Sequence, residues 1–236
     1  MLYSYMQRTQ LLMSDVRDVA INPDDLVTYI NIARGQLAGD SECVRNYATL
    51  ALASNTRQYN FSSIVLGSPS AGIQGVLNIR QALINSGSGL QWIRPRAFEW
   101  FTLFRLNNPA PTTGMPNEYA QYNQGANGSI FVDPVPSGSF TLTLDTVCYP
   151  ANLALDSDTE VIPYPWTDAV PFYAAYWAYM SLQMKDRADA MFTMYQVFTQ
   201  RGRDQSTPSV LPYIRDQAQD PTVVNKIGVK VSPGGG

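Results

Sequence analysis

The sequence contains no histidine at all among its 236 residues. Without an imidazole ring, neither a Ser-His-Asp nor a Cys-His catalytic arrangement can be built. Zinc and iron sites that use histidine ligands are excluded for the same reason. A metal site would therefore have to consist of carboxylate and carbonyl oxygens alone.

Cysteine is nearly as scarce, since only Cys43 and Cys148 occur. The two do not form a CxxC pair, and two cysteines in a chain of this length do not make a disulfide scaffold. We expect two reduced, buried small side chains. A single disulfide between them is the alternative.

Charged residues make up only 15% of the chain, and the net charge is −3. An average soluble domain carries roughly 25% charged residues. A surface poor in charge is typical of a protein whose faces are covered by other subunits, although a β-rich extracellular module would show it too. The weak overall field predicts no general affinity for nucleic acid, which leaves only a local basic patch as a possible contact.

Long apolar segments and phosphate-binding motifs are missing as well. The longest apolar run, residues 169–180, is about 18 Å of helix, too short for a bilayer core of ~30 Å. The first residues lack the pattern of a secretory signal. No GK[ST] motif occurs. We therefore expect a soluble protein that is made in the host cytoplasm and does not contact a membrane.

One acidic segment resembles the start of a calcium loop, because Asp156, Asp158 and Glu160 alternate along the chain. The position that needs glycine is Val161, and the position that needs glutamate is Thr167. The segment is therefore predicted to be a solvated loop. A glycosidase-like pair of carboxylates is disfavoured too, since nothing positions one. We predict no catalytic residue, no cofactor and no metal.

Helices are predicted at both ends of the sequence. Residues 2–14 form a first helix, and Asn22 with Pro23 starts a second, whose apolar residues recur at helical spacing and for which Gly39 is a plausible C-cap. The apolar residues in question are Leu26, Ile30, Ala33 and Leu37. Residues 167–203 are predicted to form one long helix, capped by Thr167 and ended by Gly202. Its first half is apolar all round, which predicts burial on every side.

Strand patterns fill the middle of the chain. Residues 46–53 and 58–65 alternate with period two, and 75–84 with 90–93 form a hairpin around 85–89. A short helix is predicted at about 95–106, and further strands at 119–122, 129–132 and 139–149. The fold class is thus α+β: a helical bundle (two N-terminal helices plus one long late helix) with an inserted antiparallel β domain and an extended C-terminal tail. The predicted boundaries are 1–45 and 151–204 for the bundle, 46–150 for the β-rich region and 205–236 for the tail.

The tail and the late helix carry the candidate contact residues. The tail lacks strong periodicity and contains several prolines, so it is predicted to be disordered or docked on a partner. Lys185, Arg187, Arg201 and Arg203 make the end of the predicted long helix basic. They either interact with the helix dipole or contact an acidic partner or DNA phosphates. The 14 tyrosines and four tryptophans serve core packing, an oligomer interface, or both.

The order of elements resembles the head-to-tail adaptor (connector) proteins of tailed bacteriophages over about residues 1–204. The likeness rests on Asn22-Pro23-Asp24-Asp25-Leu26, on Tyr29-Ile30-Asn31-Ile32-Ala33-Arg34, on the aromatic segment 94–101 and on the stretch from Ile162 to Tyr176. The resemblance implies a structural virion protein without enzymatic activity.

The resemblance also implies partners and a location. Twelve copies would form a ring around the DNA channel in the virion neck, between the portal and the tail or nozzle proteins, and would take part in genome ejection. A terminal arm would bind the portal, and here the candidates are Val210, Leu211, Tyr213, Ile214 and Arg215. Arg187, Arg201 and Arg203 are candidates for contacts with the channel DNA or a partner. The alternative is a receptor- or carbohydrate-binding β module of a virion, which the Tyr- and Asn-rich segment 107–150 supports and the apolar helix disfavours.

Overall fold

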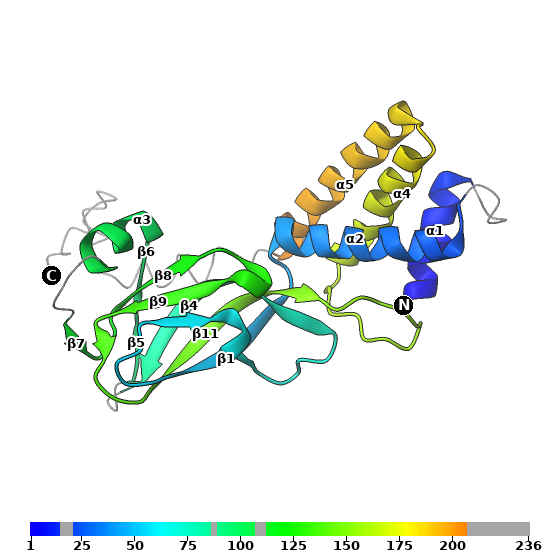
Figure 1. Ribbon diagram of the computed structural model, residues 1–236. Helices are drawn as coiled ribbons and strands as arrows, with labels where there is room; N and C mark the ends of the chain where they lie inside the picture. The colour runs from blue at the N-terminus through cyan, green and yellow to red at the C-terminus, as the bar shows by residue number, and fades with distance from the viewer. Residues whose placement is uncertain (15–20, 86–88, 107–111, 207–236) are drawn as a thin grey trace, which may run out of the picture.

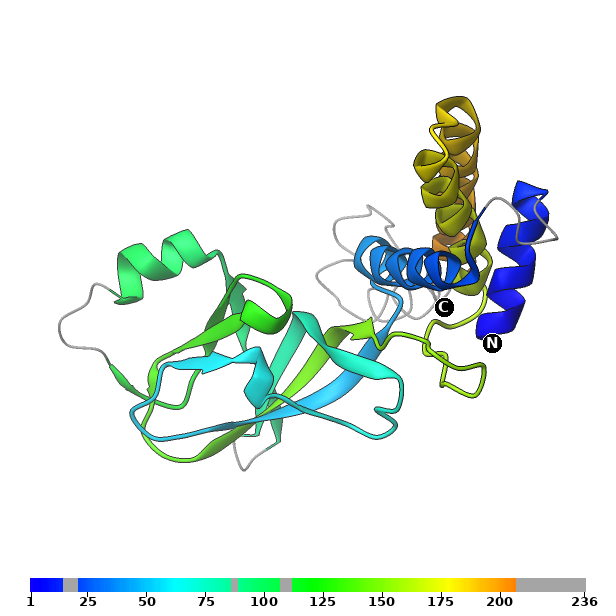
Figure 2. The same ribbon diagram turned by 45° about the vertical axis from the view of Figure 1, so that its right-hand side comes forward.

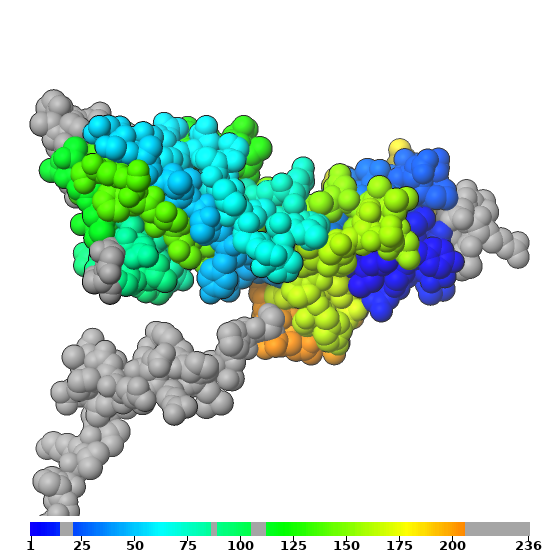
Figure 3. Space-filling view, turned by 90° about the horizontal axis from the view of Figure 1, so that it is seen from below, coloured from blue at the N-terminus to red at the C-terminus, as the bar shows by residue number. Residues whose placement is uncertain are grey.

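The computed structural model describes residues 1–14, 21–85, 89–106 and 112–206. Four of the labelled helices gather at one end of the molecule, and the strands gather at the other end together with the short helix α3 (Figure 1). The space-filling view shows the same division as two lobes (Figure 3). The predicted α+β class is confirmed.

The helical lobe contains α1 (Leu2–Met13), α2 (Pro23–Ser41), α4 (Val170–Ser181) and α5 (Lys185–Ser206). Helix α2 begins as predicted, because the Asn22 side chain accepts a hydrogen bond of 3.1 Å from the Asp24 amide and Pro23 opens the helix. The four residues of the predicted apolar stripe are all buried. The helix continues past Gly39, and Glu42 ends it in the left-handed conformation (φ 53°).

The prediction of one long late helix is wrong, because the chain reverses at residues 182–184 and forms the hairpin α4–α5. Gln183 adopts the left-handed conformation (φ 59°). The Gln183 amide donates to the Met180 carbonyl (3.0 Å), and the Met184 amide donates to the Tyr179 carbonyl (2.9 Å). This is the Schellman pattern that normally carries glycine. Since no glycine, proline or asparagine stands there, the sequence held no stop signal.

The predicted ends of that helix are displaced too. Thr167 lies in the 3-10 turn η4 (Trp166–Asp168) and does not cap α4. Gly202 lies inside α5, where a Cβ atom would come within 2.6 Å of the Trp166 ring. Glycine is therefore needed at this position for close packing and not as a helix terminator.

Helix α4 lies in the middle of the lobe and packs against α1, α2 and α5. Burial on every side was nevertheless wrong, because Trp177 and Met180 remain 37% and 40% exposed. The hairpin α4–α5 extends away from α2 in both ribbon views, so one side of it has no neighbour among the described residues (Figures 1 and 2).

The larger sheet of the β lobe has five antiparallel strands in the order β3-β1-β11-β4-β5. Their bounds are β1 (Arg45–Leu52), β3 (Val65–Leu66), β4 (Ile73–Asn85), β5 (Leu90–Trp92) and β11 (Phe140–Pro150). The predicted hairpin is confirmed by the pairing of β4 with β5, in which Leu83 lies opposite Trp92. The pairing of β4 with β11 is irregular near Asp145 and Cys148.

The second sheet has the order β2-β9-β8-β6. Its strands are β2 (Gln58–Asn60), β6 (Arg94–Arg96), β8 (Glu118–Tyr122) and β9 (Ser129–Asp133). Two pairings are parallel, β6 with β8 and the short β7 (Thr113–Gly114) with β10 (Val135–Pro136), so the β region is mostly and not wholly antiparallel. The strands predicted after residue 118 are confirmed.

Two predictions in the β region need correction. Residues 58–65 do not form one strand, because the 3-10 turn η1 (Phe61–Ser63) directs the Phe61 ring into the core and separates β2 from β3. The helix predicted at 95–106 starts later, since β6 pairs with β8 first. The helix α3 (Phe98–Phe101) and a π-helical turn η2 (Thr102–Leu106) follow it. The remaining short turn is η3 (Gly125–Asn127).

One apolar core cluster runs through both lobes. It contains Leu26 and Ile30 of α2 together with Leu142 of β11 and Ile84 of β4. The chain passes between the lobes twice, directly after α2 and directly after β11. The domain boundaries proposed from the sequence stay a prediction, because the lobes share this core.

Candidate functional site

Arg34 holds the junction between the two lobes. Its side chain is only 1% exposed. Its Nε and Nη2 atoms donate to Glu160 Oε2 and Oε1 at 3.0 and 2.9 Å, and Nη1 donates to the carbonyl of Ala151 at 2.6 Å. This bidentate salt bridge attaches α2 to the segment that follows β11.

Asn31 supports the same junction one helical turn earlier. Its Nδ2 donates to the carbonyl of Leu153 at 3.0 Å, and its Oδ1 accepts from the Leu153 amide at 2.8 Å. Asn31 and Arg34 belong to the segment that carried the family resemblance. Their role in joining the lobes was not predicted, because their partners lie more than a hundred residues away in sequence.

The surroundings of this ion pair are closed to solvent. Burial, followed by the nearby Glu160 carboxylate, raises the pKa of Tyr5 well above its ordinary value. Glu160 also accepts from the Ile162 amide at 2.9 Å. The Glu160 carboxylate is therefore engaged by protein donors, which is the arrangement of a structural ion pair and not of an acid–base catalyst.

The acidic segment 156–160 is a loop, as predicted, but it is not solvated throughout, because the Glu160 side chain is buried. Asp158 Oδ2 accepts from the amides of Ala154 and Leu155 at 2.7 and 2.8 Å, and these bonds lower the pKa of Asp158. Glu160 turns the other way, toward Arg34. In the part of the chain that the structure describes, no cluster of three or more potential metal ligands occurs.

Both cysteines are free thiols. Cys148 is buried and Cys43 is half-buried. Burial raises the pKa of Cys43 to about 11, so this thiol is protonated at neutral pH. The alternative of a disulfide between them is wrong.

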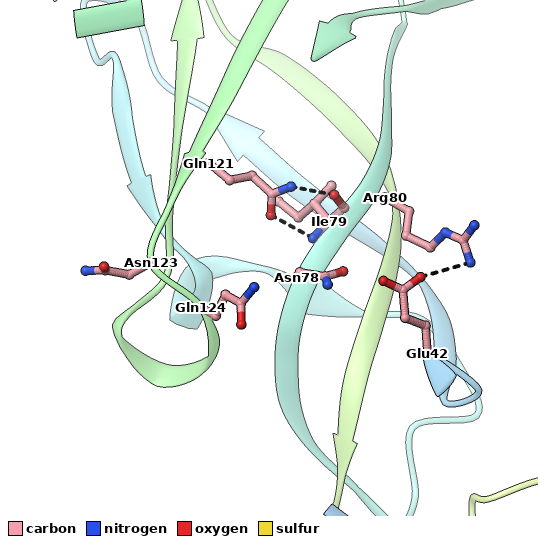
Figure 4. Close-up of a pocket in the computed structure, with 7 residues that line it drawn as sticks. All are labelled: Glu42, Asn78, Ile79, Arg80, Gln121, Asn123 and Gln124. Atoms are coloured by element: carbon pink, nitrogen blue, oxygen red, sulfur yellow. Dashed lines mark hydrogen bonds and ion pairs between the residues drawn. The ribbon is translucent and has the colours of Figure 1, made fainter. Parts of the chain in front are cut away.

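A polar hollow of about 520 Å³ lies between β4 and the end of β8 (Figure 4). Gln121 reaches across it: Nε2 donates to the Ile79 carbonyl at 2.6 Å, and Oε1 accepts from the Ile79 amide at 2.8 Å. Arg80 and Glu42 form an ion pair of 3.2 Å at its edge. The other lining residues are Asn78, Asn123 and Gln124. This hollow was not predicted from the sequence, because its amide side chains come from distant segments.

The basic residues of the late helix are not brought together. Arg187 lies in the first turns of α5, whereas Arg201 and Arg203 lie near its end and make that end basic. The two groups are separated by about 21 Å along the helix. Arg187 packs over the Tyr179 ring at 5.8 Å, and Arg203 Nη2 donates to the Asp40 carbonyl at 2.5 Å.

Aromatic rings pack along the contact between α4 and α5. Phe172 stacks on Phe198 with centroids 4.7 Å apart, and Tyr173 lies 4.7 Å from Tyr195. Tyr176 continues the series toward the tip of the hairpin. The hairpin still leaves large apolar side chains exposed: Trp177, Met180, Met184, Phe192, Met194 and Val197.

Part of this exposed surface forms a regular row on α5, which we call the outer row. It consists of Arg187, Ala190, Met194, Val197 and Arg201, which follow one another at spacings of three, four, three and four residues. All five are exposed, and Val197 is 53% exposed. This spacing is that of a seam on which another helix packs. An apolar centre with arginines at its ends is also typical of protein interfaces.

The candidate arm residues Val210, Leu211, Tyr213, Ile214 and Arg215 lie outside the described residues. Within the described ranges, the helices are either too short or too polar to cross a membrane.

Comparison with known proteins agrees with an assembly role. The family model described as SU10 adaptor protein matches residues 4–221, which is most of the chain. No curated protein matches the sequence. Members of this family are structural components of phage virions and not enzymes. The chain, with its clamped lobe junction and its exposed apolar helix face, therefore belongs to the SU10 adaptor protein family of bacteriophages.

Proposed function

We propose that this protein is a head-to-tail adaptor that joins the portal to the tail in the virion neck. Copies of the chain, twelve by resemblance, form a ring around the DNA channel and take part in genome ejection. The observation that carries the proposal, beside family membership, is the outer row of α5, an apolar helix face without a partner among the described residues.

The ring is closed by contacts between two different faces of neighbouring copies. A cyclic assembly of more than two copies needs such a heterologous interface. The outer row supplies one face, and the exposed Trp177 and Met180 on α4 supply another. Because both faces lie on the same projecting hairpin, we propose that the hairpin of one copy packs beside the hairpin of the next.

A charge placed in the outer row tests this arrangement. Val197→Asp should abolish ring formation, because a buried carboxylate without a partner costs several kcal/mol at each interface. The matched control is Gln196→Asp, which adds the same charge to an exposed residue outside the outer row. Native mass spectrometry of each variant, alone and with portal, measures the assembly. Rings of normal size from Val197→Asp would contradict the proposed interface.

We also propose that the arm binds the portal through Val210, Leu211, Tyr213, Ile214 and Arg215. An apolar segment with one arginine can add both burial and a charged contact to a partner groove. Replacing Val210, Leu211 and Ile214 by serine should weaken portal binding while the circular dichroism spectrum stays unchanged. Portal binding of normal strength would refute the arm as the binding element.

Arg187 and Arg201 are proposed as partner contacts at the ends of the outer row, whereas Arg203 also bonds to the end of α2 in its own chain. Contact of any of the three with channel DNA is tested by the salt dependence of DNA binding to assembled rings. The alternative glycan-binding function has weaker support. It is not the function of the matched family, and no aromatic ring lines the hollow of Figure 4 among the described residues.

A further inference from the structure

One strand position in the β lobe is only partly filled. Strands β5 and β6 follow each other with a single residue between them, and they pair with β4 and with β8. The Ile93 amide donates to the Ala82 carbonyl at 3.0 Å, and the Arg94 amide donates to the Asn117 carbonyl at 2.9 Å. Residues 90–96 thus occupy a gap between β4 and β8 that is one strand wide.

The same gap continues along β4 without a strand in the described part of the chain. We call this continuation the slot, bounded by residues 74–80 of β4 and by residues 121–126. The hollow of Figure 4 lies in it, and a second hollow of about 470 Å³ follows along β4. The second hollow is lined by Phe61, Ser62, Gln74, Gly75, Val76, Gly125, Ala126 and Tyr149.

The chemistry of the slot suits a peptide main chain. The Gln121 amide bonds to both the N–H and the carbonyl of Ile79, which is how a residue of a neighbouring strand would bond. Within the described ranges, Asn78 Oδ1 is a buried acceptor that lacks a donor. Asn123 and Gln124 add further amide groups, and Phe61, Val76 and Tyr149 add an apolar floor.

The tail contains one segment with the pattern of a strand. Although the tail as a whole lacks periodicity, residues 222–231 alternate. One face carries Val223, Asn225, Ile227, Val229 and Val231, and the other carries Thr222, Val224, Lys226, Gly228 and Lys230, so the alternation is regular from Lys226 to Val231. The family match ends at residue 221, so this segment lies outside the matched residues.

The tail also begins beside the slot. Arg203, near the end of α5, donates to the carbonyl of Asp40, two residues before Glu42, which lines the slot. Residues 207–221 can span up to about 50 Å when extended. The strand-like segment can therefore reach the slot of its own chain.

We infer that residues 222–231 bind in the slot of the same chain as an added β-strand, with the apolar face of the segment toward Val76 and Tyr149. This is recognition by strand addition, in which main-chain hydrogen bonds provide affinity and side-chain hollows provide register. The inference does not depend on the proposed ring or on portal binding.

Hydrogen exchange on the full chain tests the inference. The amides of residues 223–231 should exchange at least about 100-fold more slowly than in an unstructured peptide. Gly75→Phe should remove this protection, because the ring fills the slot. The matched control is Gly138→Phe, since an added Cβ meets nothing within 4 Å at either glycine. The control should leave the tail protected.

A second variant, placed in the tail, tests the inference even if Gly75→Phe does not fold. Ile227→Pro removes a donor from the tail and should speed exchange of those amides in residues 74–78 of β4 that face the slot, while ring formation stays intact. The Ile79 amide, which donates to Gln121, should not change. Tail amides that exchange freely in the wild type would overturn the inference, as would protection that survives Gly75→Phe. Protection that appears only at concentrations where copies assemble would assign the strand to a neighbouring copy and overturn the same-chain form.

Discussion

Replacing Arg34 with methionine should lower the free energy of unfolding by about 3–5 kcal/mol, because it leaves a buried carboxylate without its partner. The side chains of Arg34 and Glu160 are 1% and 7% exposed, so water cannot replace the lost bonds. Arg34→Met removes both bonds to Glu160 and the bond to the Ala151 carbonyl. Glu160 keeps only the Ile162 amide of these donors.

The size of the effect is tested best by a double-mutant cycle. Glu160→Leu should lower the free energy of unfolding about as much as Arg34→Met does. It leaves a buried guanidinium without its partner, and this group cannot lose its charge. The double variant Arg34→Met/Glu160→Leu buries no charge and should be more stable than either single variant. We therefore expect a coupling energy larger than the loss in either single variant, that is, more than about 3–5 kcal/mol.

Urea unfolding followed by tryptophan fluorescence provides the measurement. Trp166 is buried against Gly202 of α5, so its fluorescence changes when the helical lobe unfolds. The free energy of unfolding of a typical domain is about 5–15 kcal/mol, so losses of this size remain measurable. If the two single effects simply add in the double variant, within about 0.5 kcal/mol, the junction is not held by this ion pair and the argument for a clamped joint between the lobes fails.

Two further predictions concern the hairpin α4–α5. Gln183→Gly should stabilise the protein by about 1 kcal/mol in urea unfolding, because Gln183 occupies a left-handed conformation that costs glycine nothing; a loss of stability would refute this account of the turn. Burial, and then the Asp40 carboxylate, raises the pKa of Tyr195 above its ordinary value of about 10. The stability gained from neutral Tyr195 is thus complete below pH 10 and is lost as the pH rises further. Tyr195→Phe should cost about 1 kcal/mol at pH 7, and the difference from wild type should narrow above pH 10; a constant difference up to pH 11 would contradict this.

Several features could be predicted from the sequence because they depend on neighbouring residues. The start of α2 follows from Asn22 and Pro23, whose bonds and dihedral preferences are local. The hairpin of β4 with β5 and the late strands follow from alternation over a few residues. The absence of histidine constrained the chemistry in the same direct way.

The errors occurred where distant parts of the chain decide the outcome. Gln183 ends α4 although its residue type favours continuing the helix, because tertiary packing of the aromatic faces favours two antiparallel helices over one. Trp177 was expected to be buried, yet a single copy of the chain does not provide enough neighbours to cover it.

The sequence by itself determined the α+β class, the second helix, most strands and the likeness to phage adaptors. Only the tertiary structure decided that Arg34 and Asn31 join the lobes, that the basic residues of α5 lie at opposite ends, and that a strand-wide slot remains beside β4. The physical reason is one of range. Caps, turns and periodicity act over a few residues, whereas a buried ion pair or an unfilled strand position exists only after segments a hundred residues apart have packed together.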